Sequence, residues 1–510
     1  MVKGLGFVLM VLCFVVAGAP LAGAYKGQVI VALPGEPFTM DPHIRTGHID
    51  QICWRHVYDP LVHLEPGTGK LVPWLAEKWE RISPTQVKFW LRKGAKFTDG
   101  VPVTSEAVKY SIGRIFDPAN KSVVQTAFQT FDRIEVIDDH TFIWHLKKSD
   151  NGVFRTLFYR PMIMSPGTKG WSSDKVAMNP VGSGPYIFKA WEKGQQIVFE
   201  ANPDWWGNRR YPDRPKTVIL RRIVESTTRV KSLLTGEVDV IMGVLPQFIP
   251  QIKKDPETEV ASIPSTRIMM LGFFSRYGGP FADLDVRKAV NYAIDSDAIA
   301  KAFLPGMTKP IGQIYHPWSY TGYNPGKEWY PYDLAKAKEH MAKSGYPDGF
   351  KATLLSGAGQ DPADKQTCEA AVGMLEKIKI QTECRALSWS LYVRTFRNYQ
   401  SGKSKDPAMY YQGMGGAPGN PTIAMTQTGC EGGFSGACFP DLDEAFAKAD
   451  NTFDPKEQQA AFEGLTDLMK AKATHKFFFQ VDVTYGFRKK GIEFRPRHDE
   501  LFFSWEVVMK

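Results

Sequence analysis

A single arginine interrupts an apolar stretch of this chain. Arg160 lies within residues 157–166 (LFYRPMIMSP), which read as a strand-like apolar element. A planar guanidinium matches the two oxygens of a carboxylate and keeps its charge at neutral pH. Arg160 is therefore either paired with an acidic side chain of the protein or available to the carboxylate of a ligand. Both interpretations stay open, and Arg160 is a candidate ligand-binding residue.

Familiar catalytic motifs are incomplete in the sequence. Residues 433–437 (GFSGA) approach the G-x-S-x-G motif of hydrolases, but Ala437 replaces the final glycine. Residues 402–404 (GKS) match the end of a phosphate-binding loop, but Arg397 stands where its first glycine belongs. The zinc-protease motif H-E-x-x-H does not occur. We therefore predict that the chain is not an enzyme and that it has no catalytic residue.

Four histidines fall close together in the N-terminal part: His43, His48, His56 and His63. Imidazole is a common metal ligand. However, no two of these histidines have the spacing of a metal-binding pair on one helix face, and no cysteine or paired carboxylate accompanies them. We predict no metal site and no cofactor.

The cysteines could form disulfides, because export, which the N-terminal pattern predicts, permits them. Cys13 lies in the apolar N-terminal segment, so five cysteines remain and at least one is unpaired. Cys430 and Cys438 bracket a glycine-rich loop and are the best candidates for a disulfide. Cys368 and Cys384 form a second candidate pair.

The N-terminus has the pattern of a signal peptide. Lys3 precedes the apolar residues 7–16, and residues 22–24 (AGA) form a small-residue cleavage site. The apolar run is shorter than the ~20 residues needed to span a bilayer. We predict cleavage after Ala24, a periplasmic location, and no membrane insertion after cleavage.

Length and charge limit the function classes. With 510 residues the chain is too long for one core, so two or three domains are expected. The net charge of +9 comes from scattered residues, and the densest basic run, within residues 488–497, is too short for a nucleic-acid-binding arm. We predict no nucleic-acid partner.

Strands and helices that alternate along the chain must position these residues. Gln28–Leu33 (QVIVAL) reads as a strand buried on both faces, and residues 268–274 as a buried strand that crosses between domains. Thr104, Ser296 and Asp333 are placed to cap helices. The alternation predicts α/β lobes with mixed sheets.

Five segments closely resemble the family 5 extracellular solute-binding proteins, the dipeptide, oligopeptide and nickel receptors of ABC importers. The matching segments are residues 91–115, 179–186 (NPVGSGPY), 202–207 (NPDWWG), 236–241 and 280–295. The two tryptophans of the third segment are expected to pack in the core.

The resemblance implies a three-domain, type II clamshell of the periplasmic-binding-protein kind, with a hinge. After the signal peptide (1–24), domain I would comprise residues 25–58, 180–267 and 479–510. Domain II would comprise residues 59–179, and domain III residues 268–478. A ligand would be enclosed between domains I and III by hinge closure.

The function implied is that of a periplasmic receptor. It would capture a peptide-like or other bulky organic solute and deliver it to an inner-membrane permease driven by a cytoplasmic ATPase, acting as a monomer. The candidate ligand contacts, taken from the segments expected to face the cleft, are Met40, Trp54, Phe128, Arg160, Trp389, Met414 and Asn420.

One segment departs from the peptide-binding relatives. Those relatives carry G-W-x-x-D-Y, whose Asp pairs with the α-ammonium of the peptide. Here Met414 takes the Trp position and Ala417 takes the Asp position. Because alanine cannot neutralise an ammonium, either another carboxylate substitutes or the ligand is not an ordinary α-amino peptide.

Two other function classes stay open from the sequence. One is a secreted α/β hydrolase, and the other is a periplasmic chaperone or docking protein that binds no small ligand.

Overall fold

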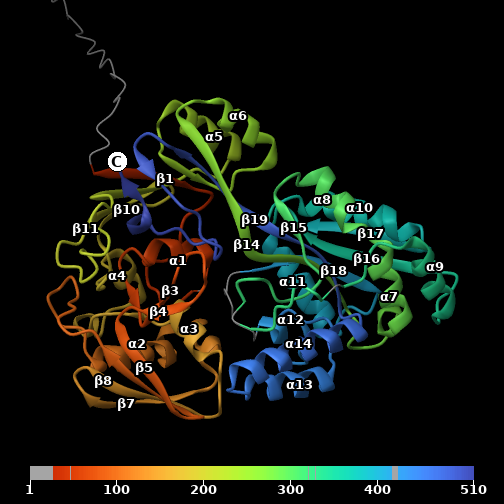
Figure 1. Ribbon diagram of the computed structural model, residues 1–510, viewed down its shortest axis with the longest axis horizontal. Helices are drawn as coiled ribbons and strands as arrows, with labels where there is room; N and C mark the ends of the chain where they lie inside the picture. Colours follow the sequence, from red (N-terminus) through yellow and green to blue (C-terminus); the bar gives the residue numbers. More distant parts are fainter. Residues whose placement is uncertain (1–26, 46, 320, 328, 416–422) are drawn as a thin grey trace, which may run out of the picture.

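Two lobes stand side by side in the computed structural model, joined by two long strands (Figure 1). The structure describes residues 27–45, 47–319, 321–327, 329–415 and 423–510. The predicted signal peptide and its cleavage site lie outside these residues. The first lobe carries β1–β13, α1–α6 and the C-terminal residues 489–510, and the second carries β15–β18 and α7–α14. Strands β14 (Thr258–Phe273) and β19 (His475–Arg488) pass between them.

Within the described residues, eleven strands form one mixed sheet that runs through both lobes. Its order is β10-β11-β12-β1-β13-β19-β14-β18-β16-β17, and β15 also pairs with β19. Besides β14 and β19, the strands are β1 (Gln28–Leu33), β10 (Tyr186–Glu192), β11 (Gln196–Ala201), β12 (Thr217–Arg222), β13 (Val240–Met242), β15 (Thr308–Pro310), β16 (Phe350–Gly357), β17 (Ile380–Leu387) and β18 (Ala408–Met414).

The crossing strands form an antiparallel ribbon. Their pairing runs from Thr258 opposite Arg488 to Gly272 opposite His475. The register is irregular between Pro264 and Ile268, where proline cannot donate a ladder hydrogen bond. The predicted crossing strand at 268–274 is confirmed, although it begins much earlier.

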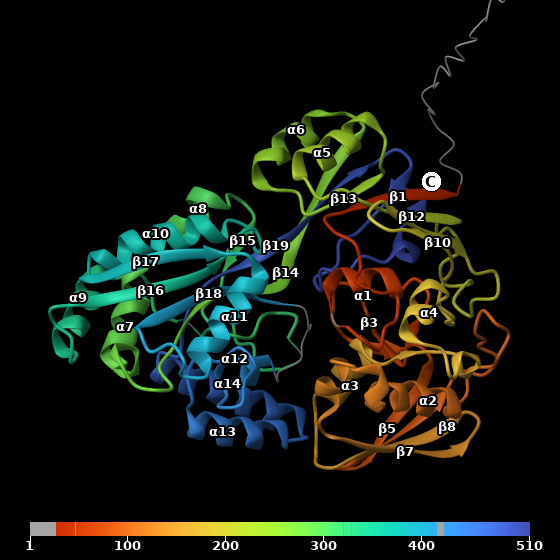
Figure 2. The ribbon, with the colours of Figure 1, turned by 180° about the vertical axis from the view of Figure 1, so that it is seen from behind.

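A four-stranded sheet, β5-β6-β8-β7, forms the far end of the first lobe, with α2 packed against β7 (Figures 1 and 2). These elements are β5 (Ala76–Ser83), β6 (Gln86–Leu91), β7 (Phe131–Asp138), β8 (Thr141–Leu146) and α2 (Ser105–Phe116). The small sheets pair β2 (Asp59–Pro60) with β9 (Met162–Ile163), β3 (Val62–Leu64) with β4 (Leu71–Pro73), and β20 (Ile492–Glu493) with β21 (Val508–Met509).

The remaining helices cover the sheets. In the first lobe they are α1 (His48–Trp54), α3 (Val153–Tyr159), α4 (Ser173–Met178), α5 (Ser226–Thr235) and α6 (Ile249–Lys254). In the second they are α7 (Leu284–Ala293), α8 (Ser296–Phe303), α9 (Leu334–Lys343), α10 (Asp364–Glu376), α11 (Trp389–Gln400), α12 (Ile423–Thr428), α13 (Pro440–Asp450) and α14 (Pro455–Ala471). No helix of the described residues has the length and apolarity to cross a bilayer.

Of the three predicted helix caps, one is confirmed and two are not. Asp333 caps α9 as predicted, accepting from the backbone N–H of Lys336. The cap of α8 was wrongly predicted, because the carboxylate of Asp295, one residue before Ser296, accepts from Ala298. Thr104 precedes α2, but its side chain makes no capping hydrogen bond.

The segment around Arg160 also differs from the prediction. Residues 157–159 complete helix α3, and only Met162–Ile163 is a strand. A short apolar run fits a buried helix end as well as a strand, so the pattern could not distinguish them.

The family segments 179–186 and 202–207 both contact the chain at Val57–Asp59, in the core of the first lobe. A Cβ added at Gly182 would lie 2.1 Å from the backbone oxygen of Val57, so the 179–186 turn requires glycine there. Asp59 accepts hydrogen bonds from the indole N–H groups of Trp74 (2.7 Å) and Trp206 (3.0 Å). The tryptophans of residues 202–207 therefore serve the fold, as predicted.

Candidate functional site

Arg160 follows α3, on the side of the first lobe that faces the second lobe in both views (Figures 1 and 2). Its side chain is partly exposed. Its guanidinium makes no hydrogen bond or ion pair with any described residue, and its Nε is buried without a partner. Burial lowers the pKa of Arg160 to about 10, which still leaves it charged at neutral pH. This cation is therefore available to an acidic ligand.

A second cation, Arg55, lies beside Arg160 at the end of α1. It is fully buried, and its Nη2 donates to the backbone oxygen of Phe158 at 2.5 Å. Its guanidinium stacks 4.3 Å from the centroid of the Phe158 ring. Burial lowers the pKa of Arg55 to about 9, and the charge of Arg160 contributes to the lowering. The nearby hydroxyl of Tyr159 is buried without a partner among the described residues. The guanidinium of Arg55 and the hydroxyl of Tyr159, next to Arg160, therefore form a cluster of hydrogen-bond donors that suits an anion.

The carboxylates nearest to this group are already paired. Arg497 donates to Asp499 through Nε (3.0 Å) and Nη2 (2.6 Å), and to Glu506 through Nη1 (2.9 Å). Asp499 and Glu506 are therefore held by Arg497, and neither forms an ion pair with Arg55 or Arg160.

An ion network joins the lobes beside the crossing strands. Arg267, on β14, donates to Glu500 through Nε (3.1 Å) and Nη2 (2.8 Å), and to Asp361 of the second lobe through Nη1 (2.9 Å). Burial opposes ionisation of Glu500, but Arg267 outweighs it and lowers the pKa of Glu500 to about 2. Burial raises the pKa of Asp361 despite the same arginine.

Two further contacts bring the lobes together. The rings of Trp318 and His498 stack with centroids 3.9 Å apart. The side-chain amide of Asn151 donates to the backbone oxygens of Asp450 (2.6 Å) and Thr452 (2.8 Å) in the second lobe. The lobes thus touch at well-separated points.

The second lobe contributes aromatic surface. Trp389, at the start of α11, is 43% exposed and stacks on Tyr392 (5.3 Å) and Phe434 (6.2 Å). The hydroxyl of Tyr392 donates to Gln412, which in turn donates to Gln427. Trp389 is thereby held in place while one part of it stays accessible.

The other predicted contacts are placed differently. Met40 and Trp54 are fully buried in the core of the first lobe, and Phe128 packs in the same core against Trp144. Met414 is buried in β18 opposite Ile268. These positions can support a binding surface, and ligand contact by any of them stays a prediction.

Asn420 and Ala417 lie outside the described residues. Arg55 was missed; its signal is a cation directly after the buried helix end Ile52–Trp54, similar to that of Arg160 after α3.

The histidines are dispersed among structural contacts. His43 bonds the backbone oxygen of Met162, and His56 lies between the backbone oxygen of Ile52 and the hydroxyl of Ser504. Burial lowers the pKa of both imidazoles to about 4. In the part of the chain that the structure describes, no group of three or more His, Cys, Asp or Glu could hold a metal ion.

Both candidate disulfides are present. Cys430 bonds Cys438, Cys368 bonds Cys384, and Cys53 is a buried free thiol.

A family model, described as bacterial extracellular solute-binding proteins, family 5 middle, matches residues 70–435. The chain belongs to this family. The protein named glutathione-binding protein GsiB from Pectobacterium atrosepticum is 26% identical over 504 residues, covering 94% of this chain and 93% of the relative. Its counterpart from Escherichia coli is 25% identical over 456 residues, covering 87% and 86%.

Solved structures agree with this membership. The periplasmic binding protein AgaA of Agrobacterium tumefaciens, in complex with agropinic acid, has a TM-score of 0.79 and 26% identity, covering 95% of this chain and 99% of its own. The ABC transporter-associated periplasmic binding protein DppA of Helicobacter pylori, in complex with peptide STSA, has a TM-score of 0.78 and 23% identity, covering 95% of this chain and 98% of its own. The predicted family and clamshell fold are confirmed, and the chain is a solute-binding receptor of the ABC-importer type.

Proposed function

We propose that this chain captures an acidic, peptide-like or other bulky organic solute between its lobes in the periplasm and delivers it to an inner-membrane permease. The observation that carries the proposal is the guanidinium of Arg160, charged, partly buried and unpaired among the described residues. A ligand carboxylate would supply its missing partner, because charge-assisted pairs with arginine are strong and directional.

Arg55 and Tyr159 extend this proposal. Their unpartnered Nε and hydroxyl groups lie next to Arg160 and favour a second acceptor on the ligand. Trp389 offers a stacking surface on the opposite lobe. Ligand names among the relatives, glutathione and agropinic acid, support an organic acid or a peptide-like acid.

The α-ammonium of an ordinary peptide has a less suitable partner among the described residues. Asp361 of the second lobe already holds Arg267 and the backbone N–H of Gly413. We therefore propose that recognition depends on the anionic end of the solute.

Hinge closure completes the proposal. Domain I (25–58, 180–267, 479–510) and domain III (268–478) close on the solute, domain II (59–179) supports domain I, and the receptor acts as a monomer. The contacts of Trp318 with His498 and of Arg267 with Asp361 would stabilise the closed arrangement. Cleavage after Ala24 would release the mature receptor.

The first experiment identifies the solute. Mature protein purified under native conditions is compared by native and denaturing mass spectrometry. We expect an intact, acidic small molecule that leaves on denaturation. Repeated preparations without any bound molecule, and no calorimetric binding to glutathione or agropinic acid, would favour a docking protein. Release of a chemically altered molecule would favour the hydrolase and refute our proposal that the receptor leaves its solute unchanged.

The second experiment tests Arg160. Arg160→Met keeps a flexible, unbranched stem and removes the charged guanidinium. Loss of a charge-assisted hydrogen bond costs about 1.5–3 kcal/mol, so the Kd of the identified acid should rise ~10–100-fold. Arg495→Met is the matched control, because Arg495 is 88% exposed and, within the part of the chain that the structure describes, forms an ion pair only with Glu493. Equal affinities of wild type and Arg160→Met would reject the role of Arg160.

A further inference from the structure

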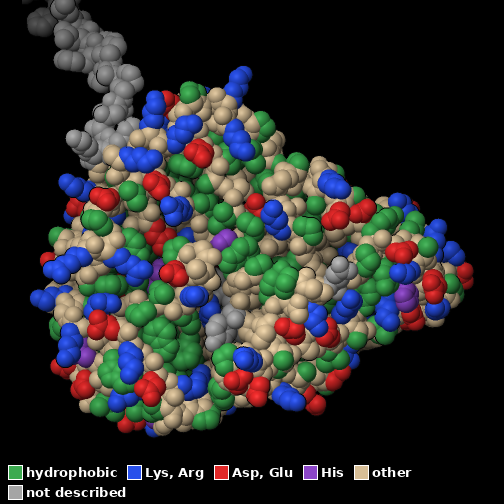
Figure 3. Space-filling view, viewed as in Figure 1, with side chains coloured by type: hydrophobic (Ala, Val, Ile, Leu, Met, Phe, Trp, Pro, Cys, Tyr) green, Lys and Arg blue, Asp and Glu red, His purple; other side chains and the backbone are tan. Residues whose placement is uncertain are grey.

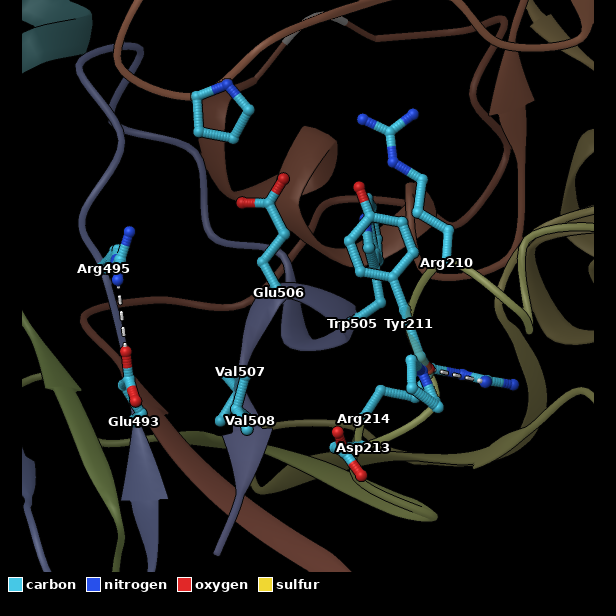
Figure 4. Close-up of a pocket in the computed structure, with 12 residues that line it drawn as sticks. Arg210, Tyr211, Asp213, Arg214, Glu493, Arg495, Trp505, Glu506, Val507 and Val508 are labelled. Atoms are coloured by element: carbon cyan, nitrogen blue, oxygen red, sulfur yellow. Dashed lines mark hydrogen bonds and ion pairs between the residues drawn. The ribbon is translucent and has the colours of Figure 1, made fainter.

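A separate cavity of about 400 Å³ lies on the first lobe (Figure 4). It is formed by the β3–β4 turn, the loop 210–214 and the C-terminal hairpin. The residues that matter for its chemistry are Arg210, Tyr211, Trp505, Glu506 and Val508. All residues that line it belong to the first lobe, so it is distinct from the region between the lobes.

Two aromatic rings form preformed walls of this cavity. Tyr211 stacks on Trp205 with centroids 5.7 Å apart and an interplanar angle of 23°. Trp505 stacks on Phe503 at 4.4 Å and 10°. Because the protein itself fixes both rings, a ligand that packs against them would order little of the protein.

Polar groups with unused hydrogen-bonding capacity lie at or just behind the surface of this cavity. Glu506 uses one carboxylate oxygen to accept from Arg497, and its other oxygen accepts no hydrogen bond from a described residue. The indole N–H of Trp505 is buried without a hydrogen-bond partner among the described residues. Arg210 forms no ion pair with a described residue, and its guanidinium lies 5.6 Å from the centroid of the Tyr211 ring.

The charges of Arg210 and Glu506 lie at one end of the cavity. In Figure 4 the guanidinium of Arg210, the hydroxyl of Tyr211 and the carboxylate of Glu506 lie toward the same end. Burial raises the pKa of Glu506, while Arg497 and, to a smaller extent, Arg210 lower it. A cation and an anion that stand beside apolar walls, without pairing to each other, match the two ends of a zwitterion.

We propose that this cavity binds a free α-amino acid with an aromatic or large apolar side chain. Its ammonium donates to the free oxygen of Glu506, its carboxylate accepts from Arg210, and its side chain packs against Tyr211, beside Trp505 and the exposed Val508. The volume falls within the range of known small-molecule sites, ~300–1,000 Å³. The site is independent of the proposed solute site at Arg160.

The test is calorimetry on the full mature protein with L-phenylalanine as the probe. We expect saturable 1:1 binding that Arg210→Met weakens at least 10-fold and that Arg209→Met, at the exposed neighbouring position, leaves unchanged. N-acetylphenylalanine and phenylalanine amide, which each lack one charge, should bind at least 10-fold more weakly.

Arg160→Met separates the two sites, because it should leave L-phenylalanine binding unchanged. The proposal is overturned by an absence of saturable binding at millimolar L-phenylalanine or by equal affinities of wild type and Arg210→Met. Loss of binding in Arg160→Met alone would also overturn it, since the amino acid would then occupy the space between the lobes.

Discussion

Glu500 offers the sharpest test of how the lobes are held together. Its carboxylate forms a two-pronged ion pair with Arg267, while Arg267 also holds Asp361 of the other lobe. Glu500 itself adopts φ of 61°, a left-handed backbone conformation that is uncommon outside glycine. Its carbonyl accepts from the hydroxyl of Tyr485, which helps to hold this backbone in place.

The size of the stabilisation by Glu500 follows from the shift of its pKa on folding. The difference between the ordinary pKa of 4.5 and about 2, at 1.36 kcal/mol for each pH unit, corresponds to about 3 kcal/mol in favour of the carboxylate form. Glu500→Gln keeps the shape and removes the charge. We therefore expect the free energy of unfolding at pH 7 to fall by roughly that amount.

The direction of the pKa shift determines how this stabilisation changes with pH. Because the pKa of Glu500 is lowered by folding, its stabilisation is complete above pH 4.5 and is lost as the pH falls toward 2. Urea unfolding of wild type and Glu500→Gln should therefore differ by about 3 kcal/mol at pH 7 and by less at pH 3.5. Glu493→Gln is the control, since Glu493 is half-exposed and its ion pair among the described residues is with the exposed Arg495.

A difference below about 1 kcal/mol at pH 7, the size of a surface ion pair, would refute the reasoning. So would a gap that stays constant as the pH falls.

Two further predictions concern the first lobe. Gly182→Ala should lower the free energy of unfolding by about 2 kcal/mol or more, because the added Cβ would strike the backbone of Val57. Gly113→Ala in α2 meets open space and should raise the free energy of unfolding by ~0.5–1 kcal/mol. Thermal unfolding measures both variants, and equal effects would refute the packing argument. Burial raises the pKa of the Cys53 thiol, so Ellman's reagent should find no thiol in the native mature protein and one in the denatured, unreduced protein. A thiol that reacts in the native state would contradict the burial of Cys53.

Sequence patterns predicted best those features that depend on neighbours in the chain. The strand Gln28–Leu33 and the cap at Asp333 each follow from a few adjacent residues, and both are confirmed. The crossing strand was found because residues 268–274 are continuously apolar. Its earlier part is mostly only partly buried and carries Pro264, so composition gave no indication of its start.

The candidate site depends on distant partners, which limited prediction. Arg160 was found because it interrupts an apolar run, yet its lack of a partner is visible only in the fold. Arg497 and Arg160 are both arginines near aromatic residues, but Arg497 holds two carboxylates of the C-terminal segment. Nothing in the spacing distinguishes these two environments.

The continuous sheet has a mechanical consequence. Since β14 and β19 remain hydrogen-bonded to each other from one lobe to the other, a rotation of the lobes must be absorbed as twist and bend of this ribbon. The irregular pairing between Pro264 and Ile268 leaves the ribbon with fewest ladder bonds at that point. Arg267 lies within this weak span, so the side chain that ties the lobes together also stiffens the place where they would rotate. A rotation about this ribbon would therefore have to strain or break the ion pairs that Arg267 forms with Glu500 and Asp361.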